Sequence, residues 1–217
     1  MLKKLTEEKL SEVLEAGICE FADKGLSNTS MSVVAKRAGI SVGVLYKYYE
    51  NKDAFFNACI RRCVASMDSF LHELCAQKKK PLQYAEALIS AVQQFSSQHR
   101  DYTRLYLEVT RTADREQAAL LAREIEGLSS KLYTEIVRRA QAAGEVRSDL
   151  DPRLFAFFMD NLLMMMQFSY CCPYYQERFK IYGGENVMDD SNLVPSQLLK
   201  FLESAFQADI PQTEVSE

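Results

Sequence analysis

The sequence is poor in residues that interrupt helices, because only 8 of its 217 residues are Gly, 5 are Pro and none is Trp. Collagen-like, low-complexity and turn-rich all-β proteins are therefore excluded. Histidine occurs only at His72 and His99, and neither lies in a pattern with serine, cysteine or carboxylate residues. Gly-rich phosphate loops, HExxH and GxSxG are missing as well. We expect no catalytic residue, metal site, cofactor or enzyme activity.

The first ten residues, MLKKLTEEKL, contain no apolar run typical of a secretion signal. We therefore expect a reducing, bacterial-type cytoplasm, in which cysteines stay mostly free thiols. The neighbouring pair Cys171 and Cys172 leaves a redox role open beside the simpler interpretation of buried thiols. The other four cysteines are Cys19, Cys59, Cys63 and Cys75.

Charge is distributed unevenly along the chain. Lys and Arg number 26 against 30 Asp and Glu, a net charge of −4, which argues against wholesale coating of nucleic acid. Between residues 29 and 62, however, there are six basic residues and only two acidic ones, Glu50 and Asp53. This is the pattern of a basic face on an acidic body, which favours attraction to phosphates.

The hydrophobic pattern predicts helices almost throughout. Thr6 is a candidate N-cap, followed by apolar residues at helical spacing up to a stop at Gly25. A second helix is expected from Ser30, ended by a turn at Gly39 that needs a left-handed conformation. Ser41 caps a third helix to Tyr48. We expect further helices at 52–80 (after Asn51 as N-cap), 82–99, 102–112, 115–143, 152–172 and 194–207, an acidic loop at 183–195 and a frayed tail at 211–217.

Two short helices joined by a Gly-containing turn, directly before a long helix, are typical of a helix-turn-helix whose last helix enters a DNA major groove. The segment TSMSVVAKRAGISVGVLYKYYENKD at 29–53 resembles the N-terminal signature of the TetR (tetracycline-repressor-like) family of bacterial regulators. Tyr48 and Tyr49 stand where the family commonly has His and Phe. The resemblance covers residues 10–56 and implies an all-α fold with a DNA-binding domain at 1–51 and a ligand-binding and dimerisation domain at 52–210, joined by the helix at 52–80.

The candidate DNA contacts divide by chemistry. Val42 and Val44 suit thymine methyl groups, Gly43 permits close approach of the backbone, and Lys47 is the only long donor for a base edge. Because the helix lacks Arg, Asn and Gln, we predict that specificity depends more on apolar contacts and DNA shape than on hydrogen bonds. Phosphate contacts are expected from the remaining candidates, for which solvated, core-filling or helix-capping roles are the alternatives: Thr29, Ser30, Ser41, Tyr46, Tyr48 and Lys52.

The resemblance also implies a small-molecule effector, which the sequence does not identify but which we expect to be largely apolar. Two groups of residues at helical spacing are candidates for its pocket, although plain core packing is an equal alternative. They are Tyr102, Tyr106 and Val109, and Asn161, Met165 and Phe168.

The apolar segment at 152–172 is interrupted by Asp160, Asn161 and Gln167, so we reject a transmembrane interpretation and any membrane partner. By resemblance, 152–172 and 194–207 form a four-helix bundle between two copies. The sequence thus predicts a ligand-responsive repressor that binds a palindromic operator on double-stranded DNA as a homodimer. The alternative is a helical small-molecule carrier or interaction protein whose helix-turn-helix binds no DNA.

Overall fold

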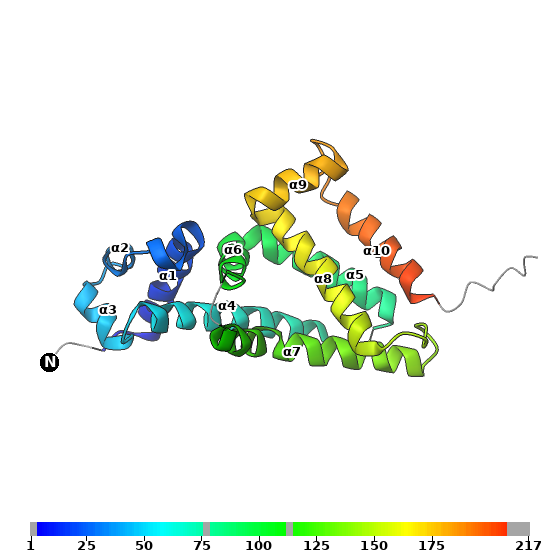
Figure 1. The fold of residues 1–217 in the computed structure, drawn as a ribbon, viewed down its shortest axis with the longest axis horizontal. Helices are drawn as coiled ribbons and strands as arrows, with labels where there is room; N and C mark the ends of the chain where they lie inside the picture. Colours follow the sequence, from blue (N-terminus) through cyan, green and yellow to red (C-terminus); the bar gives the residue numbers. More distant parts are fainter. Residues whose placement is uncertain (1–3, 76–78, 112–114, 208–217) are drawn as a thin grey trace, which may run out of the picture. The chain divides into compact units, whose positions relative to one another are not determined.

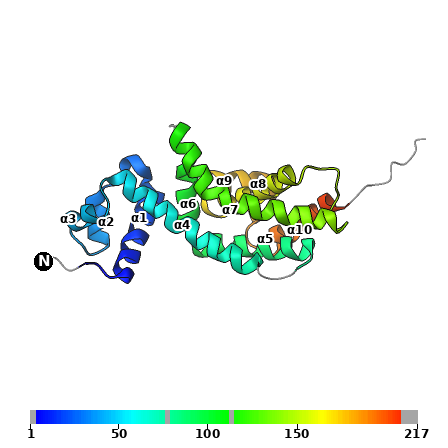
Figure 2. The same ribbon diagram turned by 90° about the horizontal axis from the view of Figure 1, so that it is seen from below.

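A computed structural model describes residues 4–75, 79–111 and 115–207. In these ranges the chain forms ten α-helices and no strand, which confirms the all-α prediction (Figures 1 and 2). Backbone contacts divide it into two compact units, Met1–Phe70 with His99–Ile125 and Leu71–Gln98 with Glu126–Glu217. The expected domain boundary between residues 51 and 52 is placed at the end of the DNA-binding motif rather than by backbone contacts, and it stays a prediction.

The first unit contains the helices that carry the motif. Its predicted N-caps are confirmed, because Thr6 Oγ1 accepts from the Lys9 amide at 3.2 Å and Asn51 Oδ1 accepts from the Ala54 amide at 2.8 Å. Gly25 has a left-handed φ of 72°, but it kinks the first helix rather than ending it. The helices are α1 (Glu7–Asn28), α2 (Met31–Arg37), α3 (Val42–Tyr48), α6 (Arg100–Val109), and the first parts of α4 (Lys52–Cys75) and α7 (Arg115–Ala142).

Aromatic rings fill the space between α1 and the start of α4. The Phe21 ring packs against Phe55 and Phe56, with centroids 5.7 and 5.0 Å apart, and Tyr49 packs on Phe55 at 4.7 Å. Tyr49, at a position where the resembled family commonly has Phe, therefore packs as an aromatic ring against Phe55. Gly17 admits the Phe55 ring, because a Cβ at Gly17 would lie 2.6 Å from Phe55 Cε1.

The second unit is built around α5 (Pro81–Gln98), which packs against both α8 (Pro152–Cys171) and α10 (Leu193–Phe206). One helix there was not predicted: α9 (Pro173–Gly183) follows α8 after a single residue. Pro173 is the first residue of α9, where its missing amide costs nothing. The acidic loop is confirmed from Gly184, although α10 begins earlier than expected. The predicted tail at 211–217 lies outside the described residues.

Helix α8 is long and apolar enough to cross a membrane by length and composition. Its apolar residues have another explanation, because Phe155, Met159 and Leu163 are buried within the unit. Asp160 is a half-buried carboxylate on this otherwise largely apolar helix. Burial, with a smaller contribution from the nearby Glu126 carboxylate, raises the pKa of Asp160 to about 6.

We predict that Gly17→Ala destabilises the protein by about 1–3 kcal/mol, because the added methyl group forces Phe55 and Cys59 out of their positions. Gly127 in α7 is the matched control, since a Cβ there meets nothing within 4 Å. The Gly127→Ala protein should gain about 0.5–1 kcal/mol from helix propensity. Urea denaturation of both variants measures these effects, and equal stabilities would contradict the close packing at Gly17.

We also predict that Asp160→Asn raises stability at neutral pH. A folded-state pKa above the unfolded value means that the folded protein holds more protons, so stability falls as pH rises through about 6. Thermal melting of wild type and variant at about pH 5 and about pH 7 should show a stability difference that grows with pH. Asp189→Asn, at an exposed position, should show no such pH dependence.

Candidate nucleic-acid interface

The turn between α2 and α3 has the geometry that the sequence predicts. Gly39 adopts a left-handed φ of 66°, and the Ile40 amide donates to the Ala35 carbonyl at 3.0 Å. Ser41 then caps α3, its Oγ accepting from the Val44 amide at 3.3 Å. These contacts fix the direction in which α3 leaves the turn.

Helix α3 is anchored by one side chain and otherwise open. Leu45 is buried, with 1% of its surface exposed, whereas Tyr46 is 47% exposed and Lys47 is exposed beside it. Val42 and Val44 are half-buried, and a Cβ at Gly43 would meet nothing within 4 Å. Gly43 is therefore required neither by internal packing nor by a left-handed backbone, which leaves room for an external molecule at this point.

The junction between α1 and α2 separates the roles of Thr29 and Ser30. Thr29 is buried and caps the end of α1, because its hydroxyl donates to the carbonyls of Gly25 at 2.8 Å and Glu20 at 3.1 Å. Its amide is also used, donating to Gly25 at 3.2 Å. Ser30 occupies the N-cap position of α2 without a side-chain capping bond and is exposed. Of the pair, Ser30 is the one that remains accessible.

Lys52 makes contacts within the protein that neither interpretation of the sequence anticipated. Its ammonium donates to the carbonyl of Ser27 at 3.0 Å and lies 3.4 Å from that of Thr29, at the end of α1. These carbonyls offset the unfavourable position of a cation in the first turn of α4. Because an ammonium has three N–H groups, the contacts leave donor capacity for a phosphate.

Tyr48 is held from a distant part of the chain. Its phenolic oxygen accepts from the Leu5 amide at 2.6 Å, so the hydroxyl proton is still available to donate outward. The ring is half-buried, and Tyr46, which is more exposed, lies on the same short helix. Both positions are compatible with the predicted phosphate contacts, which the structure does not test.

Ion pairs neutralise part of the positive charge of residues 29–62. Arg61 pairs with Glu124 at 3.5 Å, Arg62 with Glu15 at 3.3 Å, and Arg37 with Glu20 at 3.2 Å. Among the described residues, Lys36 and Lys47 have no ion-pair partner. The exposed cation on the recognition helix is therefore Lys47.

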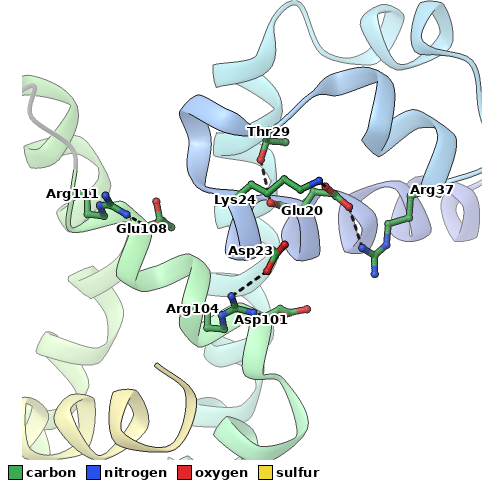
Figure 3. A network of polar contacts seen from close by, with 9 residues as sticks. All are labelled: Glu20, Asp23, Lys24, Thr29, Arg37, Asp101, Arg104, Glu108 and Arg111. Atoms are coloured by element: carbon green, nitrogen blue, oxygen red, sulfur yellow. Dashed lines mark hydrogen bonds and ion pairs between the residues drawn. The ribbon is translucent and has the colours of Figure 1, made fainter. Parts of the chain in front are cut away.

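Buried Glu20 ties α2 to α1, as Figure 3 shows. It accepts from Lys24 at 2.7 Å and from Arg37 at 3.2 Å. The Lys24 hydrogen bond, followed by the one from Arg37, outweighs desolvation and lowers the pKa of Glu20. Arg37, a candidate for the basic face by sequence, thus serves in part to position α2.

Helix α6 also contacts α1 through polar groups (Figure 3). Arg104 reaches Asp23 at 3.5 Å, and Tyr102 donates to Glu15 at 2.6 Å. Burial and the bond to Glu15 raise the pKa of Tyr102. Tyr102 was expected in an effector pocket, but its hydroxyl is committed to α1. No local sequence pattern predicts this contact, because the two residues are 87 positions apart.

The two groups of candidate pocket residues fall in different compact units. Tyr102 and Val109 are buried in the first, with Tyr106 half-buried. In the second, Asn161 Nδ2 donates to the Phe157 carbonyl at 2.7 Å, Met165 is half-buried, and Phe168 is buried. Their role as a ligand pocket stays a prediction.

Cys171 and Cys172 are buried, and the thiol of Cys171 donates to the Ser96 carbonyl at 3.2 Å. Over the part of the chain that the structure describes, no group of three or more His, Cys, Asp and Glu residues is placed to hold a metal ion. The side chains of His72 and Cys75 lie outside that part.

Comparison with known proteins decides the family. Residues 13–59, which span α1 to the start of α4, match the model described as bacterial regulatory proteins, tetR family. Residues 13–59 therefore carry the helix-turn-helix of the TetR family. The match covers the helix-turn-helix, so the interface described above is the family's shared element.

The individual proteins similar to this chain are distant from it in sequence. Nucleoid occlusion factor SlmA of Glaesserella parasuis is 25% identical over 164 residues, 74% of this chain and 80% of the relative. The probable acrEF/envCD operon repressor of Escherichia coli is 26% identical over 168 residues, 74% of this chain and 76% of that one. Among solved structures, FadR from Bacillus subtilis in complex with stearoyl-CoA matches with a TM-score of 0.71 at 18% identity, covering 91% of this chain and 100% of that chain. This likeness shows a shared fold.

We predict that Gly43→Ala strengthens the fold and weakens DNA binding. The methyl group has open space inside the protein and raises helix propensity, which adds about 0.5–1 kcal/mol to stability. It also enlarges the helix surface where we expect DNA to approach. Thermal melting and fluorescence anisotropy with an operator duplex should move in opposite directions. Unchanged operator affinity would contradict close approach at Gly43.

Proposed function

We propose that this TetR-family protein is a ligand-responsive transcriptional repressor that binds a palindromic operator as a homodimer, rather than an enzyme. The observation that carries the proposal is the exposed face of α3, with Gly43, Tyr46 and Lys47 on a helix anchored by Leu45. A single helix of this length reads only a few base pairs, so two half-sites are needed for useful affinity. The cytoplasm is the compartment in which we place this activity.

The homodimer is supported by apolar side chains that the single chain leaves uncovered. On α8, Leu154, Phe157 and Phe158 are between 56% and 60% exposed, and Phe201 on α10 is 61% exposed. Soluble proteins seldom leave such large residues clustered in water unless they meet a partner. This supports the predicted self-association through 152–172 and 194–207.

A largely apolar effector is supported by the relatives and by the composition of the second unit. FadR, which shares the fold, was solved with stearoyl-CoA, a ligand with a long apolar chain. The apolar residues Met159, Leu163 and Met166 line the inner side of α8. We propose that the effector favours a conformer in which α4 tilts and the two α3 helices leave the spacing of about 34–36 Å between successive major grooves. Spin-label distances between the α3 helices with and without effector test this tilt, and an unchanged distribution would refute it.

The central test is footprinting after a genomic pull-down with the purified protein. We expect protection of a palindrome near its own gene and a steep loss of binding with rising salt. Indifference to every duplex at low ionic strength would overturn the proposal in favour of a ligand carrier. The relationship to SlmA favours a second candidate, a role on the nucleoid as a whole. Binding dispersed over many chromosomal sites, instead of a few operators, would support that candidate.

We predict that Lys47→Ala weakens binding to operator and non-operator DNA while leaving most of the sequence preference intact. Lys47 is the exposed cation on α3, and removing its positive charge from the DNA surface should reduce the salt slope by at most about 0.9, the value for one neutralised phosphate. Lys131→Ala, on the exposed face of α7, should change neither quantity. Titrations at several salt concentrations measure both effects. Complete loss of sequence preference would show that hydrogen bonding from Lys47, rather than shape, carries specificity.

A further inference from the structure

Helix α9 follows α8 directly and packs against its last turns. Its inner side holds this position, because the Tyr175 ring packs on Phe168 with centroids 5.3 Å apart. Gln176 Nε2 also donates to the Tyr170 carbonyl at 2.9 Å. In Figure 1, α9 starts where α8 ends and turns away toward α10. The helix is thus a fixed part of the second unit.

This packing divides the outer face of α8 into two halves. Leu154, Phe158, Asn161 and Met165 follow one another at helical spacing, and Phe168 continues the row. At the start of the row the large apolar residues are exposed, whereas Phe168 at its end is only 2% exposed, with Tyr175 of α9 packed against it. The same face is therefore bare in its first half and covered by α9 at its end.

The outward side of α9 exposes large apolar side chains beside charged ones. Tyr174, Ile181 and Tyr182 are 74%, 82% and 79% exposed. Tyr174 and Ile181 share one side of the helix at a spacing of seven residues, with the exposed Glu177 between them, and Tyr182 adjoins Ile181 near the end of the helix. Arg178 lies on the same side with its guanidinium 5.2 Å from the centre of the Tyr182 ring. Helix α9 thus covers Phe168 at the end of α8 and exposes further apolar side chains of its own.

We propose that the outward side of α9 packs against the bare first half of α8 in a second copy of this chain. The inference rests on the proposed homodimer and adds α9, which lies outside 152–172 and 194–207, to the segments that make contact. In a two-fold dimer every contact occurs twice, so the two patches, one at each end of α8, cover each other when the axis passes near the middle of this helix. Each copy then supplies one α9 and receives the other.

A second copy is favoured as the occupant because of where the uncovered residues lie. Twelve large apolar side chains are exposed in the described residues, and eight of them are on α8, α9 and α10. The proposed homodimer uses α8 and α10, so the α9 surface continues that interface. Helix α8 spans about 30 Å at 1.5 Å per residue, so the axis can pass between the two patches.

Sedimentation equilibrium of the full chain tests the contact. We expect Ile181→Asp and Phe158→Asp each to raise the dimer dissociation constant at least about tenfold, because each places a carboxylate in an apolar interface. Leu120→Asp is the matched control, since Leu120 is exposed on α7 outside the proposed surface, and it should stay within about twofold of wild type. All three side chains are exposed, and circular dichroism checks that the variants keep their helical content.

The outcomes separate this inference from the homodimer. A normal dimer with Ile181→Asp, together with a weakened one with Phe158→Asp, would overturn the role of α9 and leave the homodimer standing. A wild-type chain that remains monomeric would overturn both. Direct contact is tested by the double variant Ile181→Lys with Phe158→Glu, whose opposite charges should restore association at least about fivefold over either single variant. Additive losses would overturn the pairing of α9 with α8.

Discussion

The end of α1 is the constraint on which the position of the recognition helix depends. Carbonyl groups at a helix end need donors, and here Thr29 supplies its amide and hydroxyl while Lys52 supplies its ammonium. Thr29 leads into α2 and Lys52 begins α4, so the two ends of the segment that carries α3 are tied to the same place. Helix α3 has only seven residues, too few for stability in isolation. Its orientation therefore comes from this junction, from the Gly39 turn and from buried Leu45.

Much of this local geometry could be predicted from the sequence because its causes are local. A serine or asparagine three residues before the amide it caps, or a glycine at a left-handed turn, acts within one helical turn, as at Ser41, Asn51 and Gly39. The contacts of Lys52, Glu15 and Leu5 could not be predicted in the same way. Each joins positions far apart in the chain, and the hydrophobic pattern carries no information about which distant polar group will lie opposite. Helix α9 was missed for a different reason: its exposed aromatic residues obscure the amphipathic pattern on which helix prediction depends.

The chemistry of α3 imposes a particular mode of recognition. Arg37 is engaged with Glu20, and Lys47 remains as the exposed cation of the helix, so a charge-based reading of DNA would have little to work with. Apolar side chains and a glycine with open space around it are instead suited to methyl groups and to the local shape of the groove. Affinity must then come largely from pairing two such surfaces. Weak sequence-specific binding of DNA by each α3 and the need for a dimer both follow from the apolar residues, the glycine and the single exposed cation of this helix.

Helix α8 shows how competing requirements share one segment. Its inner side forms the core with α5, and its outer side is left apolar, which is tolerable in water only if something covers it. The chain covers the end of that surface with α9, but α9 itself exposes Tyr174, Ile181 and Tyr182. An isolated chain gains little from exchanging one exposed apolar face for another. The exchange becomes favourable when the new face has a complementary surface to meet, and a two-fold axis supplies that surface without any additional sequence, because the uncovered half of α8 is present in every copy.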